Sequence, residues 1–430
     1  MRTCIIGVLL SIAFTPVTAQ AGKVRTGIEV LLADNAMLLR GKRVALITHP
    51  AGVTAELEST ADALFRIPGV TLVALMGPEH GIRGAAYAGE SVVDDRDSKT
   101  KLPVYSLFGK DSKPTPEMLK GVDMIVYDLQ DIGVRSYTYV TTLALVMEAA
   151  ADAGIPVIVL DRPAPMGGLR VDGNVPPADW AKSFVCWLRV PYVYGMTPGE
   201  MARMINGENW LPGGKHADLT VVPLEGWKRG MSFADTGLPW VLTSPHIPHE
   251  ETAYFYPMTG LAAPSLNNGV GYTLPFELIG APWIDGDRLA AKLNEQALPG
   301  LHFRQIGFKP FYGAHKGIAC QGIQVHITDH ASAPMFPISF YVLEALNQLY
   351  PERRILEEPP LPPDLRSFWK RLFTKRPKPA SAWKDWEDAA CDPAIRRQLA
   401  NGRSVREMAE EWRRDDDLFL ITRKKYLLYR

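Results

Sequence analysis

Four short apolar runs mark the first half of the chain, and stretches of helical spacing separate them. The runs cover Arg43–Thr48, Thr71–Met76, Asp123–Asp128 and Pro156–Asp161. Short runs that are apolar at nearly every position are typical of parallel strands buried on both faces. The intervening spacing predicts helices over Gly27–Leu39, Glu58–Phe65 and Tyr137–Ala153. The pattern therefore predicts an α/β fold, with a Rossmann-like, doubly wound and mostly parallel sheet.

The second half of the chain has a less regular pattern. Residues 220–285 are rich in proline, glycine and aromatic residues, which predicts long ordered loops. A strand over Gly322–Ile327 and helices over Ser339–Leu349 and Val405–Arg414 follow, and prolines between 355 and 380 indicate an exposed loop. We therefore expect a Rossmann-like domain over 22–245 and a smaller C-terminal α/β domain over 246–430, which closes a cleft.

The N-terminus has the pattern of a cleaved export signal. Met1 and Arg2 precede an apolar run over Ile5–Phe14, and small residues follow up to Ala21. The run is too short to span a membrane comfortably, and no later segment is apolar for long enough. We expect a signal peptide over 1–21, a mature protein without a membrane span, and a periplasmic or secreted location.

Composition narrows the classes of partner. Lysine and arginine total 47, and aspartate and glutamate total 47, so there is no excess positive charge for nucleic acid or an anionic membrane. The hydrophobic content of 47% is that of a folded protein. Three cysteines follow the signal, namely Cys186, Cys320 and Cys391, and they form no C-x-x-C motif. One disulfide is compatible with this set, with one thiol left over, and the spacing does not say which two pair.

Ionisable groups follow all four of the predicted strands, and His49 follows the first of them. Because the carboxyl ends of parallel strands meet at one edge of a sheet, these groups should converge on a single cleft. The candidates are Glu79, His80 and Arg83 after the second run, Asp128, Gln130, Asp131, Arg135 and Tyr137 after the third, and Asp161 and Arg162 after the fourth. A pair of carboxyl groups in such a cleft is what hydrolysis of a glycosidic bond commonly uses.

Glu79 is the leading candidate for a catalytic acid, because Pro78, Gly81 and Gly84 leave it few neighbouring side chains to shield it. Each other group has a structural alternative. Asp128 and Asp161 could be turn or cap residues, and Arg83 and Arg135 could neutralise carboxylates in buried pairs. His80 could be a catalytic partner, a hydrogen-bond donor to substrate, or a structural residue.

Competing motifs are absent or weak. The sequence has no G-x-G-x-x-G after a strand, no P-loop and no G-x-S-x-G, which disfavours dinucleotides, nucleotide hydrolysis and α/β-hydrolase chemistry. The segment His246–Glu251 contains two histidines and two glutamates, but Pro248 disturbs the helical spacing of metal ligands. We expect no metal and no cofactor.

Several motifs are specific enough to suggest a family. They are Gly77–Gly84 with Ala88–Glu90, Asp128–Tyr139, Asp161–Pro163, Tyr194–Glu200, Gly226–Arg229, Thr236–Trp240, Pro275–Trp283 and Arg423–Tyr429. In this order they resemble the exo-β-N-acetylmuramidase family, the NamZ-like peptidoglycan hydrolases. The resemblance implies a Rossmann-like domain, a smaller C-terminal domain and Glu79 as the catalytic residue. The chain departs from the family pattern at 262–273, at His246 and at Ala164.

These observations lead to one functional hypothesis and one alternative. The hypothesis is an exo-acting glycoside hydrolase that releases terminal β-linked N-acetylmuramic acid, or a related amino sugar, from peptidoglycan fragments or muropeptides. Glu79 would be the general acid and Asp128 or Asp131 the second group, with His80 assisting. The predicted substrate-binding residues are Arg83, Gln130, Arg135, Tyr137, Asp161, Arg162 and Glu277. The alternative is a periplasmic glycan-binding protein without turnover.

Overall fold

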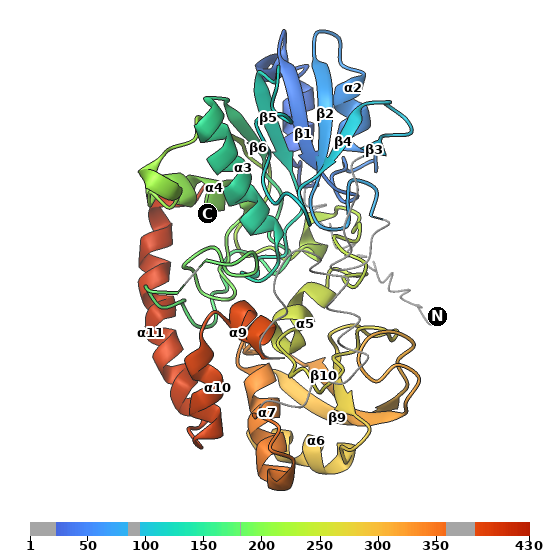
Figure 1. Cartoon of the computed structure of the whole chain (residues 1–430), viewed down its shortest axis with the longest axis vertical. Helices are drawn as coiled ribbons and strands as arrows, with labels where there is room; N and C mark the ends of the chain where they lie inside the picture. Colours follow the sequence, from blue (N-terminus) through green and yellow to red (C-terminus); the bar gives the residue numbers. More distant parts are fainter. Residues whose placement is uncertain (1–22, 85–94, 181, 358–382) are drawn as a thin grey trace, which may run out of the picture.

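The computed structural model describes residues 23–84, 95–180, 182–357 and 383–430 (Figure 1). The predicted signal peptide, the Ala88–Glu90 motif and nearly all of the predicted proline-rich loop lie outside these residues. Two bodies are stacked along the long axis of the molecule, with the N-terminal half of the chain in one and most of the C-terminal half in the other. No helix within the described ranges is long and apolar enough to cross a membrane.

The first body is built on a seven-stranded sheet with the order β3-β4-β2-β1-β5-β6-β7. The strands are β1 (Arg43–Thr48), β2 (Thr71–Gly77), β3 (Asp95–Arg96), β4 (Pro103–Ser106), β5 (Met124–Asp128), β6 (Val157–Leu160) and β7 (Leu219–Val222). Every pairing is parallel except that of the edge strand β3 with β4. The predicted fold class is confirmed.

Helices cover both faces of this sheet, as the apolar strands require. The helices α1 (Gly27–Ala33) and α2 (Thr60–Phe65) pack on the face that carries Val44 and Leu46 of β1. The helices α3 (Tyr139–Ala153) and α4 (Pro198–Gly207) pack on the face that carries Ala45 and Ile47. Alternate residues of one strand thus serve two cores, which leaves only the strand ends for chemistry.

The boundaries differ from the predicted ones in two ways. The helix predicted over Gly27–Leu39 ends at Ala33, because Asn35 and Ala36 adopt left-handed backbone angles, and a 3-10 turn covers Met37–Leu39. The strands β3, β4 and β7 had no counterpart in the sequence pattern, since they have only two to four residues each. Further 3-10 turns cover Pro212–Gly214, Ala234–Thr236, Pro351–Arg353 and Lys424–Tyr426.

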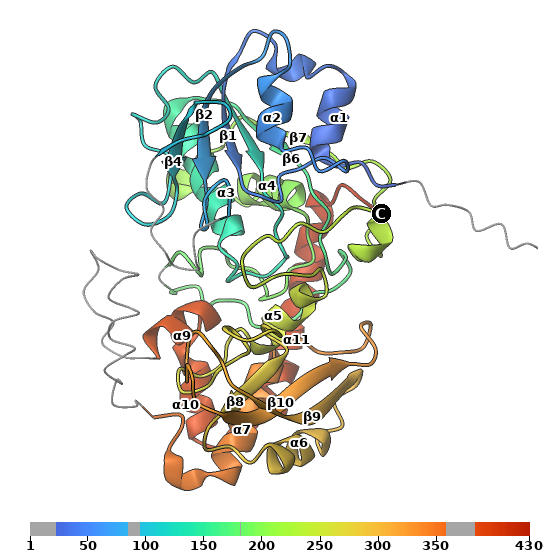
Figure 2. The same ribbon diagram turned by 90° about the vertical axis from the view of Figure 1, so that its right-hand side faces the viewer.

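The second body contains a three-stranded antiparallel sheet of order β8-β10-β9. Its strands are β8 (Leu278–Ala281), β9 (Leu301–Phe308) and β10 (Cys320–Ile327), and α6 (Gly286–Asn294) and α7 (Ile338–Leu349) pack beside them. The helix α5 (Thr252–Thr259) lies between the two bodies (Figure 2). The prediction of loops throughout 220–285 is therefore wrong for α5 and β8. These elements have too few residues to show a recognisable helical or strand periodicity.

The C-terminal segment joins the two bodies. It consists of α9 (Lys384–Ala390), α10 (Pro393–Ala400) and α11 (Val405–Arg423), and α11 extends nine residues beyond the predicted helix end at Arg414. Figure 1 shows α11 running along the side of the molecule from one body to the other. The residues after it pack on the first body, where Arg203 donates to the Tyr426 carbonyl at 2.9 Å. The domain boundary at 245/246 stays a prediction.

Candidate active site

Glu79 lies at the carboxyl end of β2 and meets a residue from the connection that follows β5. Its side chain is half-buried, and Thr138 Oγ1 donates to Glu79 Oε2 at 3.0 Å. Thr138 is the residue that precedes α3, in the connection that follows β5. The sheet therefore brings together groups that are 59 positions apart in the sequence, as parallel strands with a common direction allow.

Two histidines stand next to Glu79. His80 is 6% exposed and has a φ of 75°, and Gly81 after it has a φ of 73°, so the chain turns sharply directly after the acid. His49 directly follows β1 and is 2% exposed. Its ring nitrogens have no hydrogen-bond partner in the described part of the chain. Burial and the charges of Arg162 and His80 lower the pKa of His49, which keeps its imidazole neutral.

Aromatic residues and a threonine form one wall of the site. Tyr137 and Tyr139 meet edge to face with ring centroids 4.9 Å apart, and Tyr137 meets Tyr256 of α5 at 5.6 Å. The Tyr137 hydroxyl lies 2.7 Å from Thr243 Oγ1, and the Tyr139 hydroxyl donates to the Thr243 carbonyl. Because both hydroxyls are held in this way, the wall is fixed in place before any ligand binds.

The segment around His246 lies close to His80. The ring of His246 stacks on that of Tyr312, with centroids 6.2 Å apart and an angle of 15° between the planes. Burial and the nearby charge of His80 lower the pKa of His246. Tyr312 belongs to the connection between β9 and β10, so the second body contributes side chains next to those of the first.

Asp131 is the second carboxyl group of the site. Its Oδ1 accepts from the Gly133 amide at 2.6 Å and from the Tyr194 hydroxyl at 2.7 Å. Its Oδ2 is buried and has no hydrogen-bond partner among the described residues. Burial raises the pKa of Asp131 to about 6. The charges of Asp131 and Glu79 both add to the rise in the pKa of Tyr137 that burial causes, so both carboxyl groups lie near this ring.

Asp128 is placed differently from the prediction. Its carboxylate is fully buried and forms an ion pair with Arg162, whose Nη2 lies 2.8 Å from Oδ2, and it also accepts from the Thr60 hydroxyl. A carboxylate with these partners and no exposed surface does not reach a substrate. The geometry therefore assigns Asp128 a structural role, in place of the catalytic role that the sequence predicts.

Asp161 is likewise structural. It is fully buried and accepts from Thr197 Oγ1 and from the Gly199 amide, both at 2.7 Å, and from the Tyr429 hydroxyl. It binds the start of α4 to the C-terminal tail, which is the cap-like role that the sequence left open. The predicted contact between Asp161 and substrate is corrected on this ground.

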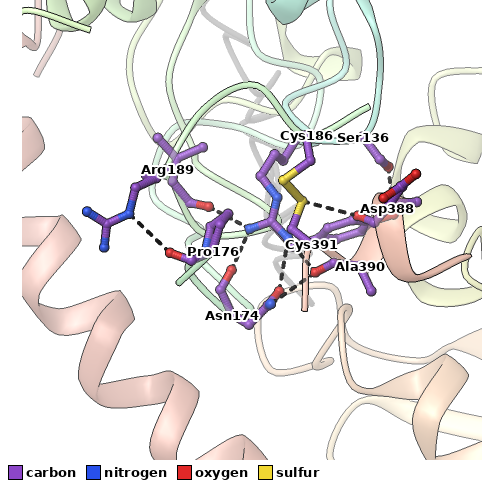
Figure 3. The surroundings of a disulfide bond; sticks show 12 residues. Ser136, Asn174, Pro176, Cys186, Arg189, Asp388, Ala390 and Cys391 are labelled. Atoms are coloured by element: carbon purple, nitrogen blue, oxygen red, sulfur yellow. Dashed lines mark hydrogen bonds between the residues drawn. A yellow bond between two sulfur atoms is a disulfide. The ribbon is translucent and has the colours of Figure 1, made fainter. Parts of the chain in front are cut away.

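Arg135 is fully buried at a junction of three segments. Its Nη1 donates to the Val190 carbonyl at 2.7 Å, and its Nη2 donates to Asn174 Oδ1 at 2.9 Å and to the Ala390 carbonyl at 3.0 Å. Figure 3 shows the disulfide Cys186–Cys391 beside Asn174 and Ala390, two residues to which Arg135 donates. Burial lowers the pKa of Arg135 to about 9. Arg135 therefore holds protein carbonyls, and its predicted contact with substrate is wrong because no part of it is exposed.

Three further predicted residues have other neighbours. Arg83 is partly exposed and forms an ion pair with Asp97, with Nη2 2.7 Å from Oδ1. Gln130 is buried and donates to the carbonyls of Asp131 and Pro163, both at 2.8 Å. Glu277 lies in the second body, where it accepts from Gln324 at 3.2 Å, and burial raises the pKa of its carboxyl group.

Several residues of the site escaped prediction. They are His49, Thr138, Tyr139, Thr243, His246, Tyr256 and Tyr312. The strand-end rule placed His49 at this edge of the sheet but gave it no role. The residues from 243 onwards lie in irregular segments, whose position a sequence pattern does not give. Histidine, cysteine and carboxylate side chains in the described ranges form no group of three that could hold a metal ion.

Comparison with known proteins covers nearly the whole chain. Residues 44–251 match the N-terminal model of the exo-β-N-acetylmuramidase NamZ, and residues 254–429 match its C-terminal model. The peptidoglycan β-N-acetylmuramidase NamZ of Bacillus subtilis is 43% identical over 413 residues, which are 96% of this chain and 93% of that protein.

Two solved structures from Bacteroides fragilis, both of DUF1343 family proteins, share the fold. One has a TM-score of 0.84 at 43% identity, and the other has a TM-score of 0.72 at 28% identity. Each match covers 95% of this chain and 99% of the other. The similarity therefore extends over both bodies and their arrangement.

Proposed function

This chain belongs to the NamZ family of exo-β-N-acetylmuramidases, and we propose that it is a glycoside hydrolase that releases terminal β-linked N-acetylmuramic acid from peptidoglycan fragments. The relative from Bacillus subtilis is a peptidoglycan β-N-acetylmuramidase, and its identity with this chain over both bodies supports the same activity. The observation that carries the proposal is Glu79, which is half-buried and bonded to Thr138 among fixed aromatic and imidazole groups.

In this proposal Glu79 is the general acid. Hydrolysis requires a proton on the glycosidic oxygen as the bond to the anomeric carbon breaks, and a positioned carboxylic acid delivers it. The hydrogen bond from Thr138 orients the carboxyl group, and Tyr137 and Tyr139 give it a rigid border. His80 and the neutral His49 border the same space and are suited to hydrogen bonds with sugar hydroxyls.

Asp131 is the proposed second carboxyl group. Its Oδ2 is buried without a partner in the described ranges, so a polar group of the substrate or a water molecule would satisfy it. In its ionised form it would align a water molecule near the anomeric carbon. Tyr194 and the Gly133 amide hold Oδ1 and fix the direction of Oδ2.

We further propose that the protein acts outside the cytoplasm. The disulfide Cys186–Cys391 supports this, because disulfides persist in oxidising compartments. The basic and apolar pattern of residues 1–21 supports it independently. In such a location the released monosaccharide would be available for cell wall recycling.

The test is the variant Glu79→Gln with a chromogenic β-N-acetylmuraminide. We expect kcat to fall by about 10²–10⁴-fold while the melting temperature stays within about 2 °C of the original, because the amide cannot donate the proton but keeps the shape. The matched control is Glu225→Gln, at an exposed glutamate that pairs with Arg25 on the surface. Near-normal kcat in the Glu79 variant would refute the assignment.

The alternative of a glycan-binding protein without turnover has no support from the comparisons. The same assay separates the two, since a binding protein would release no chromophore at any enzyme concentration. Incubation with peptidoglycan fragments, followed by mass analysis of the products, then shows whether single terminal sugars are removed.

A further inference from the structure

A small pocket opens beside the candidate active site, at the carboxyl ends of β1, β5 and β6. Its lining includes Val53, Gln130, Arg162, Phe233, Trp240 and Val241. Gln130 directly precedes Asp131, and Val241 comes two residues before Thr243 of the aromatic wall. The pocket is thus a neighbour of the site on the same edge of the sheet.

Two polar side chains of the pocket are nearly buried, and each has one polar atom without a hydrogen-bond partner among the described residues. Arg162 is 4% exposed and uses Nε and Nη2 to bind Asp128 and the Val53 carbonyl. Gln130 is 3% exposed and uses Nε2 to donate to two carbonyls. Among the described residues, Arg162 Nη1 and Gln130 Oε1 have no partner, yet neither belongs to the polar atoms that are sealed from solvent. The pocket therefore offers one N–H donor and one carbonyl acceptor.

The charge of the pocket favours a neutral ligand. Asp128 forms a buried ion pair with Arg162, which compensates the guanidinium charge before any ligand arrives. A second carboxylate at Nη1 would be buried without a cation of its own, at a cost in free energy. The lining also includes Thr26 and Thr54, and the rest of it is apolar, with Phe233, Trp240 and Val241 among its residues. The complementary ligand is therefore a small amide with a methyl group.

We propose that this pocket binds the 2-acetamido group of the terminal sugar, an inference that rests on the proposed function. The acetamido oxygen accepts from Arg162 Nη1, the acetamido N–H donates to Gln130 Oε1, and the methyl group contacts Trp240 and Val241. The two hydrogen bonds that Gln130 Nε2 donates fix the side-chain amide, so that Oε1 is oriented to accept from the ligand. Unpaired buried groups reject ligands that lack the matching partner, so the pocket selects N-acetylated sugars.

The test combines two changes, one in the acyl group of the substrate and one in the size of the pocket. For the original protein, we expect kcat/KM to fall by about tenfold or more from the N-acetyl to the N-propionyl muraminide, since one added methylene overfills a tight pocket. Val241→Ala removes two methyl groups from the wall and should raise the N-propionyl to N-acetyl ratio of kcat/KM by about tenfold. A misfolded variant cannot produce such a gain. Val30→Ala, in α1 and outside the pocket lining, is the control and should leave the ratio unchanged.

The outcomes separate this proposal from the proposed function. Cleavage of the N-acetyl muraminide with the same ratio in the original protein and in Val241→Ala would overturn the pocket assignment alone. If no muraminide is cleaved, the proposed function fails, and ligand-detected NMR then tests the pocket by binding. N-acetylglucosamine should bind more tightly than glucosamine, and Val241→Ala should shift the preference towards N-propionylglucosamine. Equal binding of the two unmodified sugars would overturn the pocket.

Discussion

Asp128 and Asp131 stand three positions apart in one loop and yet have opposite environments. Asp128 is neutralised by Arg162, whereas Asp131 has hydroxyl and amide donors at one oxygen and none at the other. The pKa of Asp131 is about 6 because burial penalises its charged form. Carboxyl groups with perturbed pKa values near a candidate acid are typical of catalytic sites, which favours Asp131 over Asp128 as the partner of Glu79.

The pH dependence of catalysis tests the role of Asp131. If ionised Asp131 aligns the reacting groups, kcat/KM should rise as the pH increases through about 6, where Asp131 loses its proton. Asp131→Asn should lower kcat by about 10²-fold or more and should abolish this limb of the profile. Initial rates with a chromogenic muraminide between pH 4 and 8 give the answer. If the variant shows the same rise in kcat/KM near pH 6, a group other than Asp131 causes that rise.

Thr138 permits a graded test of how Glu79 is oriented. Thr138→Val keeps the shape but removes the hydroxyl that donates to Glu79 Oε2, and we expect kcat to fall by about three- to thirtyfold with little change in KM. Thr138→Ser keeps the hydroxyl and should retain most of the activity. A rise in KM alone would show that Thr138 binds substrate instead of positioning the acid.

The sequence predicted the roles of individual site residues less well than it predicted the fold. The strand-end rule brought Glu79, His80 and Asp131 to one edge, because it needs only the direction of the strands. It does not tell which side chain at that edge points into the cleft. Asp128, Asp161 and Arg135 point inwards and bind buried partners. Aspartate and arginine residues that point into a cleft look the same in the sequence.

At the scale of elements, the central strands were predictable and the edges were not. β1, β2, β5 and β6 are buried on both faces, so their runs are apolar throughout and stand out in the sequence. β3 is exposed and has two residues, which gives no periodicity. The end of α1 depended on the left-handed backbone of Asn35 and Ala36, and alanine gives no warning of such a turn.

The helix α11 carries a buried acid whose titration should be measurable. Asp416 is 7% exposed, and its Oδ1 has no partner within the described ranges. Burial and the charge of Asp172, followed by those of Asp415 and Asp417, raise the pKa of Asp416 to about 8. Burial raises the pKa of Asp172, and the charges of Arg170 and Arg413 partly offset this rise. The neutral form of Asp416 is therefore the one that suits the contact between α11 and the first body.

The sign of the effect on stability follows from the raised pKa. Asp416 contributes fully to stability below its unfolded pKa of 3.8, and this contribution is lost as the pH rises through about 8. Asp416→Asn removes the titration, so we expect the variant to melt about 2–4 °C higher than the original at pH 9 and about equally at pH 4. Asp417→Asn, at a more exposed position of the same helix, is the control. Equal melting curves at pH 9 would contradict the prediction.

At the scale of the molecule, the C-terminal segment holds the two bodies together. It bonds to the first body through Tyr429 and Arg203, and the disulfide Cys186–Cys391 closes a link across 205 positions. The sequence allowed a disulfide but did not identify its cysteines, because pairing depends on how distant segments meet. Cys320 is the remaining thiol of the described residues, and it is buried in the second body.

The disulfide also lies next to a chain of contacts that ends at the site. Ala390, beside Cys391, accepts from Arg135, and the segment from Arg135 to Thr138 leads to Glu79. Ser136 in this segment is bonded to the Tyr192 hydroxyl at 2.7 Å. A change at the disulfide should therefore loosen the residues that orient the acid as well as the fold itself.

The last prediction uses the double variant Cys186→Ser/Cys391→Ser. Removing a cross-link of this length costs about 2–5 kcal/mol, so the melting temperature should fall by several degrees. If Arg135 transmits the loss, kcat of the folded enzyme should also fall at 20 °C, far below melting, while KM changes little. Dithiothreitol should have the same effects on the original protein and none on the double variant. Cys320→Ser should respond to dithiothreitol as the original does. A lower melting temperature with unchanged kcat would mean that the disulfide stabilises the two bodies without any influence on Glu79.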